Sequence, residues 1–137
     1  MDEVNCLLLV EDNQADLDEI QTLLAKTGVK IHKLLIARDL GQARASVKGG
    51  VDVIILDLTL PPLSGIDTLN ELKKFFDGVL VIFTEIDSDI FRLECLANGA
   101  DSYLVKGKTN EGMLKSAILY AKVRKNIKNL NEKLNSV

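Results

Sequence analysis

The sequence predicts an α/β fold, in which a parallel sheet of five strands is covered by helices on both faces. Two features support this prediction. Short apolar runs alternate five times with longer amphipathic stretches, as expected when each strand is followed by a helix. The first, third and fourth runs are aliphatic at nearly every position, as is typical of strands buried on both faces of a sheet. A length of 137 residues suits one compact domain of this kind.

The apolar runs define the expected strands, and the stretches between them define the expected helices. We expect strands at residues 6–10, 31–37, 51–56, 79–83 and 102–105, and helices at about 14–27, 39–48, 64–76, 88–98 and 110–135. In the first helix, apolar residues recur at intervals of three or four and form one stripe that faces the sheet; they are Leu17, Ile20, Leu23 and Leu24. Gly28 is placed to end this helix, and Ser88 is placed to cap the start of the fourth.

Five strand–helix units with right-handed crossovers close into a three-layer, flavodoxin-like sandwich whose parallel strands have the order 2-1-3-4-5. The first and third strands are then central neighbours. In open sheets of this kind, ligands bind beyond the carboxyl ends of the strands, where the chain changes direction between those two strands. Residues that follow the first and third strands are therefore the leading candidates for a functional site.

The composition argues against several classes of function. The formal net charge is −3, so the body of the chain has no general attraction for nucleic acid or anionic lipid. No stretch approaches the roughly 20 apolar residues that cross a bilayer, and the apolar run after Asp2 and Glu3 is too short for a secretory signal. Cys6 and Cys95 lack the spacing of a metal site or redox pair, so we expect reduced thiols. These features predict a cytoplasmic protein without membrane insertion.

The strand ends carry a distinctive set of polar residues. Glu11 and Asp12 follow the first strand, Asp57 follows the third, Thr84 ends the fourth and Lys106 follows the fifth. Because the carboxyl ends of parallel strands meet at one edge of a sheet, these five side chains are expected to lie together. Each alone is a common turn, cap or packing residue, but their joint placement predicts a site.

Neighbouring carboxylates repel one another, and a divalent cation relieves that repulsion. Mg²⁺ suits this donor set, because it binds one or two carboxylates with carbonyl and water oxygens and leaves a position for a phosphate oxygen. Lys106 and Thr84 add a positive charge and a hydroxyl donor beside Asp57. The set therefore indicates transfer of a phosphoryl group to Asp57.

Four stretches of the sequence are specific, namely LLLVEDN at 7–13, IILDLTLPPLSGIDTL at 54–69, VIFTEIDSD at 81–89 and LANGADSYLVKGKT at 96–109. On these stretches the sequence, from Cys6 to about Arg124, resembles the receiver domains of response regulators in two-component signalling. The resemblance implies a receiver domain at residues 1–124 and an extension of the last helix at residues 125–137. It also implies a signalling phosphoacceptor, which catalyses only its own phosphorylation and dephosphorylation, and not an enzyme in the ordinary sense.

The resemblance assigns the metal and phosphorylation sites. Asp57 is the implied phosphoacceptor. Glu11 and Asp12 are the implied acidic pair that binds Mg²⁺ together with Asp57, and the backbone carbonyl of Thr59 is an implied further ligand. The implied phosphodonor partner is a sensor histidine kinase or a phosphotransfer protein.

The resemblance also implies a switch. Thr84 and Lys106 contact the phosphoryl oxygens in this interpretation. Tyr103 matches the aromatic residue whose ring moves as the Thr84 hydroxyl is drawn toward the phosphate, although an ordinary half-buried tyrosine would give the same sequence. The switch is expected to change the face made by the fourth helix, fifth strand and fifth helix, which a downstream protein target then binds.

Three positions depart from the family pattern. Glu85 follows Thr84 where a small residue is usual, so its bulky anionic side chain is expected either to narrow access to the site or to repel the phosphodonor. Gly107 follows Lys106 where many members have proline, which predicts a freer loop. Pro62 replaces a frequent acidic residue in the loop after Asp57 and is expected to affect geometry more than chemistry.

The last helix continues beyond the usual end of a receiver domain. Its apolar residues keep intervals of three and four, at Tyr120, Val123, Ile127, Leu130, Leu134 and Val137. Such a seam is typical of a coiled coil, and it suggests a homodimer or docking of a partner such as a kinase. Basic residues in this stretch make an acidic protein surface a reasonable contact. An amphipathic helix folded back on its own domain would give the same pattern.

Three other functions fit parts of the pattern. A flavin-binding electron carrier would share the fold, but it needs a phosphate-binding loop in place of Glu11, Asp12 and Asn13. A phosphohydrolase of the haloacid dehalogenase type would have a second aspartate at position 59, which is a threonine here. A degenerate receiver that binds partners without phosphorylation is the main alternative. No helix-turn-helix is evident, so direct nucleic-acid binding is not expected.

Overall fold

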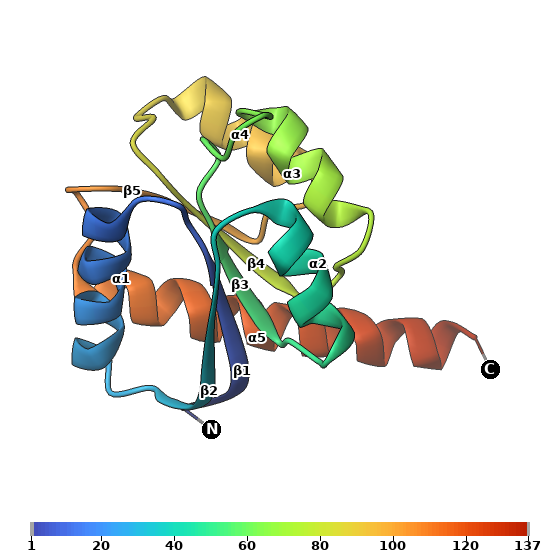
Figure 1. The fold of residues 1–137 in the computed structure, drawn as a ribbon. Coiled ribbons are helices and arrows are strands. Elements are labelled where there is room, and N and C mark those ends of the chain that lie inside the picture. Colours follow the sequence, from blue (N-terminus) through green and yellow to red (C-terminus); the bar gives the residue numbers. More distant parts are fainter. Residues whose placement is uncertain (1, 137) are drawn as a thin grey trace.

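Five strands and five helices alternate along the computed structural model, which describes residues 2–136 (Figure 1). The strands are β1 (Glu3–Val10), β2 (Lys30–Ala37), β3 (Val53–Leu56), β4 (Val79–Thr84) and β5 (Ser102–Val105). The helices are α1 (Gln14–Lys26), α2 (Leu40–Lys48), α3 (Ile66–Lys73), α4 (Asp89–Ala97) and α5 (Glu111–Asn135). Every element predicted from the sequence is therefore present.

The strands form one parallel sheet with the order β2-β1-β3-β4-β5, which confirms the predicted flavodoxin-like topology. β1 lies between β2 and β3, so the two strands that precede the acidic residues are central neighbours. In the register of β1 and β3, Val10 is opposite Leu56. Glu11 and Asp57 follow these two residues, and the pairing therefore brings both to the same edge of the sheet.

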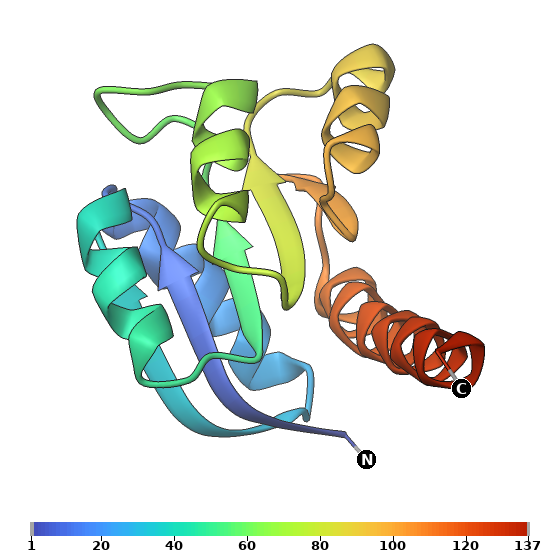
Figure 2. The ribbon, with the colours of Figure 1, turned by 90° about the vertical axis from the view of Figure 1, so that its right-hand side faces the viewer.

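A hydrophobic core fills the space on each face of the sheet. On one face, alternate residues of the strands pack with Leu17 of α1 and Ile118 of α5. On the other face, the intervening strand residues pack with Ala43 of α2, Leu69 of α3 and Cys95 of α4. Figure 2 shows the sheet between these two layers of helices. The central strands β3 and β4 are buried at every position, as their aliphatic runs predict.

Helix caps follow the signals in the sequence. Gly28 comes two residues after α1 and has φ +74°, a left-handed conformation that favours glycine. The Ser88 side chain accepts a hydrogen bond from the Phe91 amide and so caps α4. Both assignments made from the sequence are confirmed.

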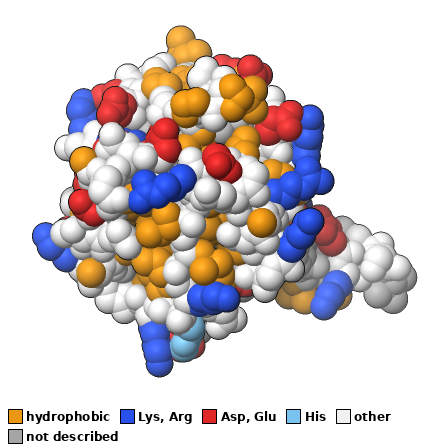
Figure 3. All heavy atoms as spheres, in the orientation of Figure 1, with side chains coloured by type: hydrophobic (Ala, Val, Ile, Leu, Met, Phe, Trp, Pro, Cys, Tyr) orange, Lys and Arg blue, Asp and Glu red, His pale blue; other side chains and the backbone are white. Residues whose placement is uncertain are grey.

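The edge strand β2 is the least covered part of the sheet. Leu34 and Ile36 are 38% and 42% exposed, and Figure 3 shows hydrophobic side chains open to solvent in the middle of the face on which β2 lies. At the right of the same view, the end of α5 stands out from the body of the molecule. None of the helices within residues 2–136 combines the length and hydrophobicity that a membrane span requires.

Candidate metal and phosphoryl-acceptor site

The strand ends place the candidate residues through backbone hydrogen bonds that continue the sheet. The Asp57 amide donates to the Val10 carbonyl at 3.0 Å, directly beyond the paired ends of β1 and β3. The Lys106 amide donates to the Thr84 carbonyl at 2.8 Å, beyond β4 and β5. Because these bonds extend the ladder, the positions of Asp57 and Lys106 are set by the sheet and not by flexible loops.

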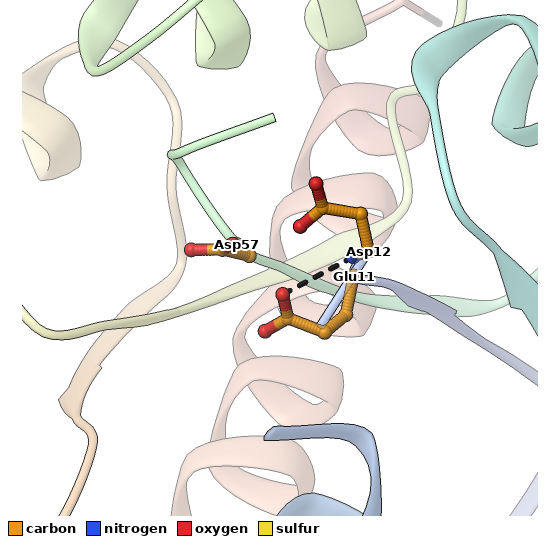
Figure 4. Close-up of side chains that lie close together, drawn as sticks. All are labelled: Glu11, Asp12 and Asp57. Carbon is orange, nitrogen blue, oxygen red and sulfur yellow. Dashed lines mark hydrogen bonds between the residues drawn. The ribbon is translucent and has the colours of Figure 1, made fainter. Parts of the chain in front are cut away.

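Three carboxylates gather at this edge, as the sequence predicts. Glu11, Asp12 and Asp57 each offer a carboxylate oxygen, and these oxygens all lie within 4.8 Å of one another. Figure 4 shows the three side chains close together beyond the ends of β1 and β3. Glu11 and Asp57 are buried, with 4% and 3% of their surface exposed, whereas Asp12 is open to solvent. The cluster thus has two buried carboxylates and one that faces the solvent.

The Glu11 carboxylate is oriented by the backbone that follows it. Its Oε2 accepts hydrogen bonds from the amides of Asp12 at 3.2 Å and Asn13 at 3.3 Å, the first of which is the dashed line in Figure 4. Its Oε1 accepts a hydrogen bond from Lys106 Nζ at 2.7 Å. Asn13 also caps α1 through its side chain, which accepts a hydrogen bond from the Asp16 amide. The turn between β1 and α1 therefore fixes both the carboxylate and the helix that begins beside it.

Lys106 joins this cluster from β5, and its side chain is only 5% exposed. Besides Glu11, its Nζ donates to Asp16 Oδ2 at 2.8 Å and lies 3.5 Å from Asp57 Oδ1. Lys106 is therefore held mainly by Glu11 and Asp16. Asp16 was not among the residues predicted for the site, although its place in the first turn of α1 puts it at the same edge of the sheet.

Burial and charge act against each other on the ionisable groups here. Burial and the nearby charge of Asp57 raise the pKa of Glu11 to about 7, against the opposite effect of Lys106. Burial alone would lower the pKa of Lys106, but its hydrogen bonds to Asp16 and Glu11 and the charge of Asp57 raise this pKa above its usual range. Lys106 is thus a fixed positive charge, while burial and the neighbouring Asp57 disfavour ionisation of Glu11.

Thr59 contacts Asp57 directly. Its amide donates to Asp57 Oδ1 at 3.3 Å and its hydroxyl donates to Oδ2 at 2.8 Å. The sequence pointed only to the backbone carbonyl of Thr59, as a metal ligand. The structure adds a second contribution of this residue, because its two donors fix the orientation of the carboxylate that is expected to react.

Thr84 and Tyr103 meet at the backbone of Ile86. Thr84 is fully buried, and its hydroxyl oxygen accepts a hydrogen bond from the Ile86 amide at 3.4 Å. The Tyr103 hydroxyl donates to the Ile86 carbonyl at 2.5 Å, and the Tyr103 ring packs edge-on against Phe91 of α4. Burial raises the pKa of Tyr103 to about 12, so this hydroxyl remains a donor. The backbone of Ile86 therefore connects Thr84, at the end of β4, with the half-buried aromatic residue of β5.

The three departures from the family pattern have different consequences in the structure. Glu85 is exposed and does not belong to the cluster of Glu11, Asp12 and Asp57. Gly107 has φ +79° and its amide donates to Glu19 Oε1 at 3.4 Å. Proline could neither adopt that φ nor donate that hydrogen bond, so the turn in this structure suits glycine. The greater freedom expected of this loop stays a prediction. Pro62 follows Pro61 through a cis peptide bond.

The family model for the response regulator receiver domain matches residues 7–118 of this chain. Among curated proteins, the transcriptional regulatory protein CpxR of Klebsiella pneumoniae is 35% identical over 103 residues, which are 75% of this chain and 43% of the relative. The sensory transduction protein RegX3 of Mycobacterium tuberculosis is 33% identical over 101 residues, which are 73% of this chain and 43% of the relative. The chain thus spans less than half the length of these relatives.

Solved structures of receiver domains and response regulators are also similar to this chain. A response regulator receiver domain from Clostridium thermocellum is 28% identical and has a TM-score of 0.74, with 90% of this chain and 98% of that chain covered. The Francisella response regulator 1452 receiver domain is 26% identical and has a TM-score of 0.72, with 88% of this chain and 98% of that chain covered. The Mn²⁺-bound form of the response regulator Rcp1 is 25% identical and has a TM-score of 0.64, with 82% of this chain and 88% of that chain covered.

Proposed function

The chain belongs to the response regulator receiver domain family of two-component signalling, and on that premise we propose that Asp57 accepts a phosphoryl group in a Mg²⁺-dependent reaction. The observation that supports this most strongly is the group around Asp57. Its buried carboxylate lies beside two further carboxylates and 3.5 Å from a buried lysine. Such a group has little use in folding alone, because it costs desolvation and repulsion.

The donor set fits a hard divalent cation. Glu11, Asp12 and Asp57 supply oxygen ligands within 4.8 Å of one another, and burial together with the neighbouring Asp57 raises the pKa of Glu11 to about 7. The Mn²⁺-bound form of Rcp1 is a similar protein that binds such an ion. We assign these three residues, with the Thr59 carbonyl, as the ligands. Bound Mg²⁺ would neutralise charge on the entering phosphoryl oxygens.

The chain's own residues position the reaction. An Asp57 oxygen forms the new O–P bond while the donor's bond to phosphorus breaks. The electron pair of that bond leaves with the donor, which is a histidine imidazole in a kinase or phosphotransfer protein and a carboxylate in a small acyl phosphate. Thr59 orients the Asp57 carboxylate, and Lys106 offers a fixed ammonium to the developing charge.

The phosphoryl group then acts on the connection from Thr84 to Tyr103. It adds about −1.5 to −2 charge and new acceptor oxygens at the edge of the sheet where β4 ends in the buried Thr84. Moving the Thr84 hydroxyl toward the phosphate gives up its bond with the Ile86 amide, and the Ile86 carbonyl is the acceptor for Tyr103. The switch is therefore a shift between two arrangements of the β4–α4 loop and the Tyr103 ring.

The proposal extends to domain limits, partners and location. The receiver domain occupies residues 1–124 and the extension occupies residues 125–137. The phosphodonor is a sensor histidine kinase or a phosphotransfer protein, and the face formed by α4, β5 and α5 presents the signal to a downstream protein. With such partners, the proposed location of the chain is the cytoplasm.

Intact-mass measurement tests the proposal. The wild type, incubated with Mg²⁺ and a small acyl phosphate, should gain the mass of one phosphoryl group, and Asp57→Ala should gain none. Asp67→Ala, which removes an exposed carboxylate in the first turn of α3, is the matched control and should behave as the wild type. An adduct that persists in Asp57→Ala would exclude Asp57 as the acceptor.

The degenerate receiver remains the second candidate because of Glu85. No adduct in the wild type, together with partner binding that is unchanged in Asp57→Ala, would favour it. A Glu85→Ala variant separates steric or electrostatic hindrance from true loss of function. If Glu85 blocks the phosphodonor, this variant gains an adduct that the wild type lacks.

A further inference from the structure

Helix α5 has two apolar faces. One face packs on the sheet through four buried residues, Leu114, Ala117, Ile118 and Ala121. The other face carries five large hydrophobic side chains that are 55–67% exposed, at Tyr120, Val123, Ile127, Leu130 and Leu134. We call these five residues the outer stripe. With 3.6 residues in each turn, the two faces lie on roughly opposite sides of the helix, so the domain to which α5 belongs cannot cover the outer stripe.

The spacing of the outer stripe identifies the kind of surface that would cover it. Its residues follow one another at intervals of three, four, three and four, which is the 3.5-residue repeat of a left-handed coiled coil. Val137, the next residue in this pattern, lies outside the described residues. A stripe with this period stays in line with a neighbouring helix over its whole length, and the expected occupant is therefore another helix.

We propose that the outer stripe forms a parallel, two-stranded coiled coil with the same stripe of a second copy of this chain. The intervals assign Tyr120, Ile127 and Leu134 to the a positions and Val123 and Leu130 to the d positions of the heptad. A β-branched residue at a followed by leucine at d, as in Ile127 and Leu130, favours two parallel strands. Because the stripe faces away from the sheet, the two domains would lie on the outside of the pair and would not collide.

The charges on α5 also favour a second copy over an acidic partner. Several of its basic side chains turn back to their own domain. Lys122 and Lys125 donate to the carbonyls of Glu3 and Asp77, and Arg124 donates to the carbonyl of Asp101. They therefore offer little to an acidic surface placed against the stripe.

The residues that flank the outer stripe would not repel each other across a parallel dimer. In the parallel register, each g position faces the e position of the next heptad in the other strand. Asn126 then faces Asn131, and Leu119 faces Arg124. No like charges are opposed at these two pairs, so pairing costs no repulsion there.

The surface area that the dimer would bury indicates how strongly the two copies associate. Five half-exposed side chains on each copy would bury on the order of 1,000 Å² in total, which is near the lower limit for a specific interface. We therefore expect a reversible dimer whose population changes with concentration over the micromolar range. This dimer requires no phosphorylation, and it can be tested in the absence of any phosphodonor.

Sedimentation equilibrium of the full chain tests the assembly. The wild type should pass from monomer to dimer as its concentration rises, whereas Leu130→Glu should remain a monomer. Asn129→Glu adds the same charge at the neighbouring position outside the seam and should dimerise as the wild type does. Circular dichroism should show the same folded state for all three proteins. A wild type that stays monomeric throughout, or a Leu130→Glu variant that still dimerises, would overturn the proposal.

Cross-linking tests the orientation. Cys6 and Cys95 are 7% and 0% exposed, so an introduced surface cysteine is the reactive one. In a parallel dimer Leu130→Cys meets its own copy and should form a disulfide-linked dimer under mild oxidation, whereas Asn129→Cys should do so far less. A wild type that dimerises, combined with a Leu130→Cys variant that does not cross-link, would rule out the parallel arrangement.

Discussion

Lys106 is the residue on which the charges at the strand ends converge. Its ammonium group lies within 2.8 Å of oxygens of Glu11 and Asp16 but 3.5 Å from Asp57. In this arrangement Lys106 is shared between the acidic pair, the first turn of α1 and the residue proposed to accept phosphate. The reactivity of Asp57 should therefore depend on how strongly its competitors hold the lysine.

Asp16 is the competitor that lies outside the proposed metal site. We expect Asp16→Asn to weaken its hold on Lys106 and to free the ammonium group for the entering phosphoryl group. A hydrogen bond of about 1 kcal/mol corresponds to a rate roughly fivefold higher for adduct formation with a small acyl phosphate. The measurement is the time course of intact mass at saturating Mg²⁺. Asp18→Asn, two residues along α1 and exposed, is the control, and an equal change in both variants would argue against a specific role of Asp16.

Glu11 should make the stability of the metal-free protein depend on pH. Its pKa is about 7 in the folded protein and near 4.5 when unfolded, so the folded state holds the proton more tightly. Stabilisation by this proton is complete below about pH 4.5 and is lost as the pH rises toward 7. We expect Glu11→Gln to flatten this part of the profile, as measured by urea unfolding in chelator. If the free energy of unfolding changed between pH 5 and 7 by the same amount in the wild type as in Glu11→Gln, this assignment would be contradicted.

At the scale of an element, the loop after β5 positions Lys106 through the conformation of Gly107. Proline at this position, as in many receiver domains, would require φ near −65°, whereas the observed φ is +79°. We expect Gly107→Pro to lose roughly 1–3 kcal/mol of the free energy of unfolding, because it also removes the hydrogen bond to Glu19. Chemical denaturation measures this loss. Gly112→Ala, at a glycine of α5 without a positive φ, should cost much less.

The elements themselves were predictable because each has a strong local signal. The aliphatic runs of β3 and β4 and the stripe of α1 are local patterns, and most of their ends agree with the structure to within two residues. β1 begins at Glu3 and not at Cys6, because Val4 is buried and pairs with Ile31 of β2. α3 ends at Lys73, three residues before the predicted end, although Phe76 beyond it is still buried. Such ends depend on tertiary packing, which local periodicity does not encode.

The site was predictable only as far as topology determines it. Strand order alone brings Glu11, Asp57 and Lys106 to one edge. The contact between Lys106 and Asp16 joins residues 90 positions apart through the turn that starts α1, and the hydroxyl of Thr59 reaches Asp57 through local loop geometry. Neither contact follows from a strand pattern, because both depend on the direction of a side chain.

For the whole molecule, the proposed metal site joins the ends of β1 and β3, which are neighbours within the sheet. Glu11 and Asp12 follow β1, Asp57 follows β3, and both strands carry the cores on the two faces of the sheet. Asp57 lies more than 40 positions along the chain from Glu11 and Asp12, so unfolding would separate it from them in space. A cation that requires all three should therefore bind the native state almost exclusively, and its binding energy should add to global stability.

We accordingly expect Mg²⁺ to raise the melting temperature of the whole chain. At a Mg²⁺ concentration 100 times the dissociation constant, the gain is about 2.7 kcal/mol, or roughly 10 °C for a domain of this size. Asp12→Asn should lose most of this gain because it removes a ligand, and it should melt no lower than the wild type in chelator because it also removes repulsion. Asp67→Asn, which removes an exposed carboxylate elsewhere, should keep the full response. If Mg²⁺ raised the melting temperature of Asp12→Asn as much as that of Asp67→Asn, the ion would bind somewhere other than the strand ends.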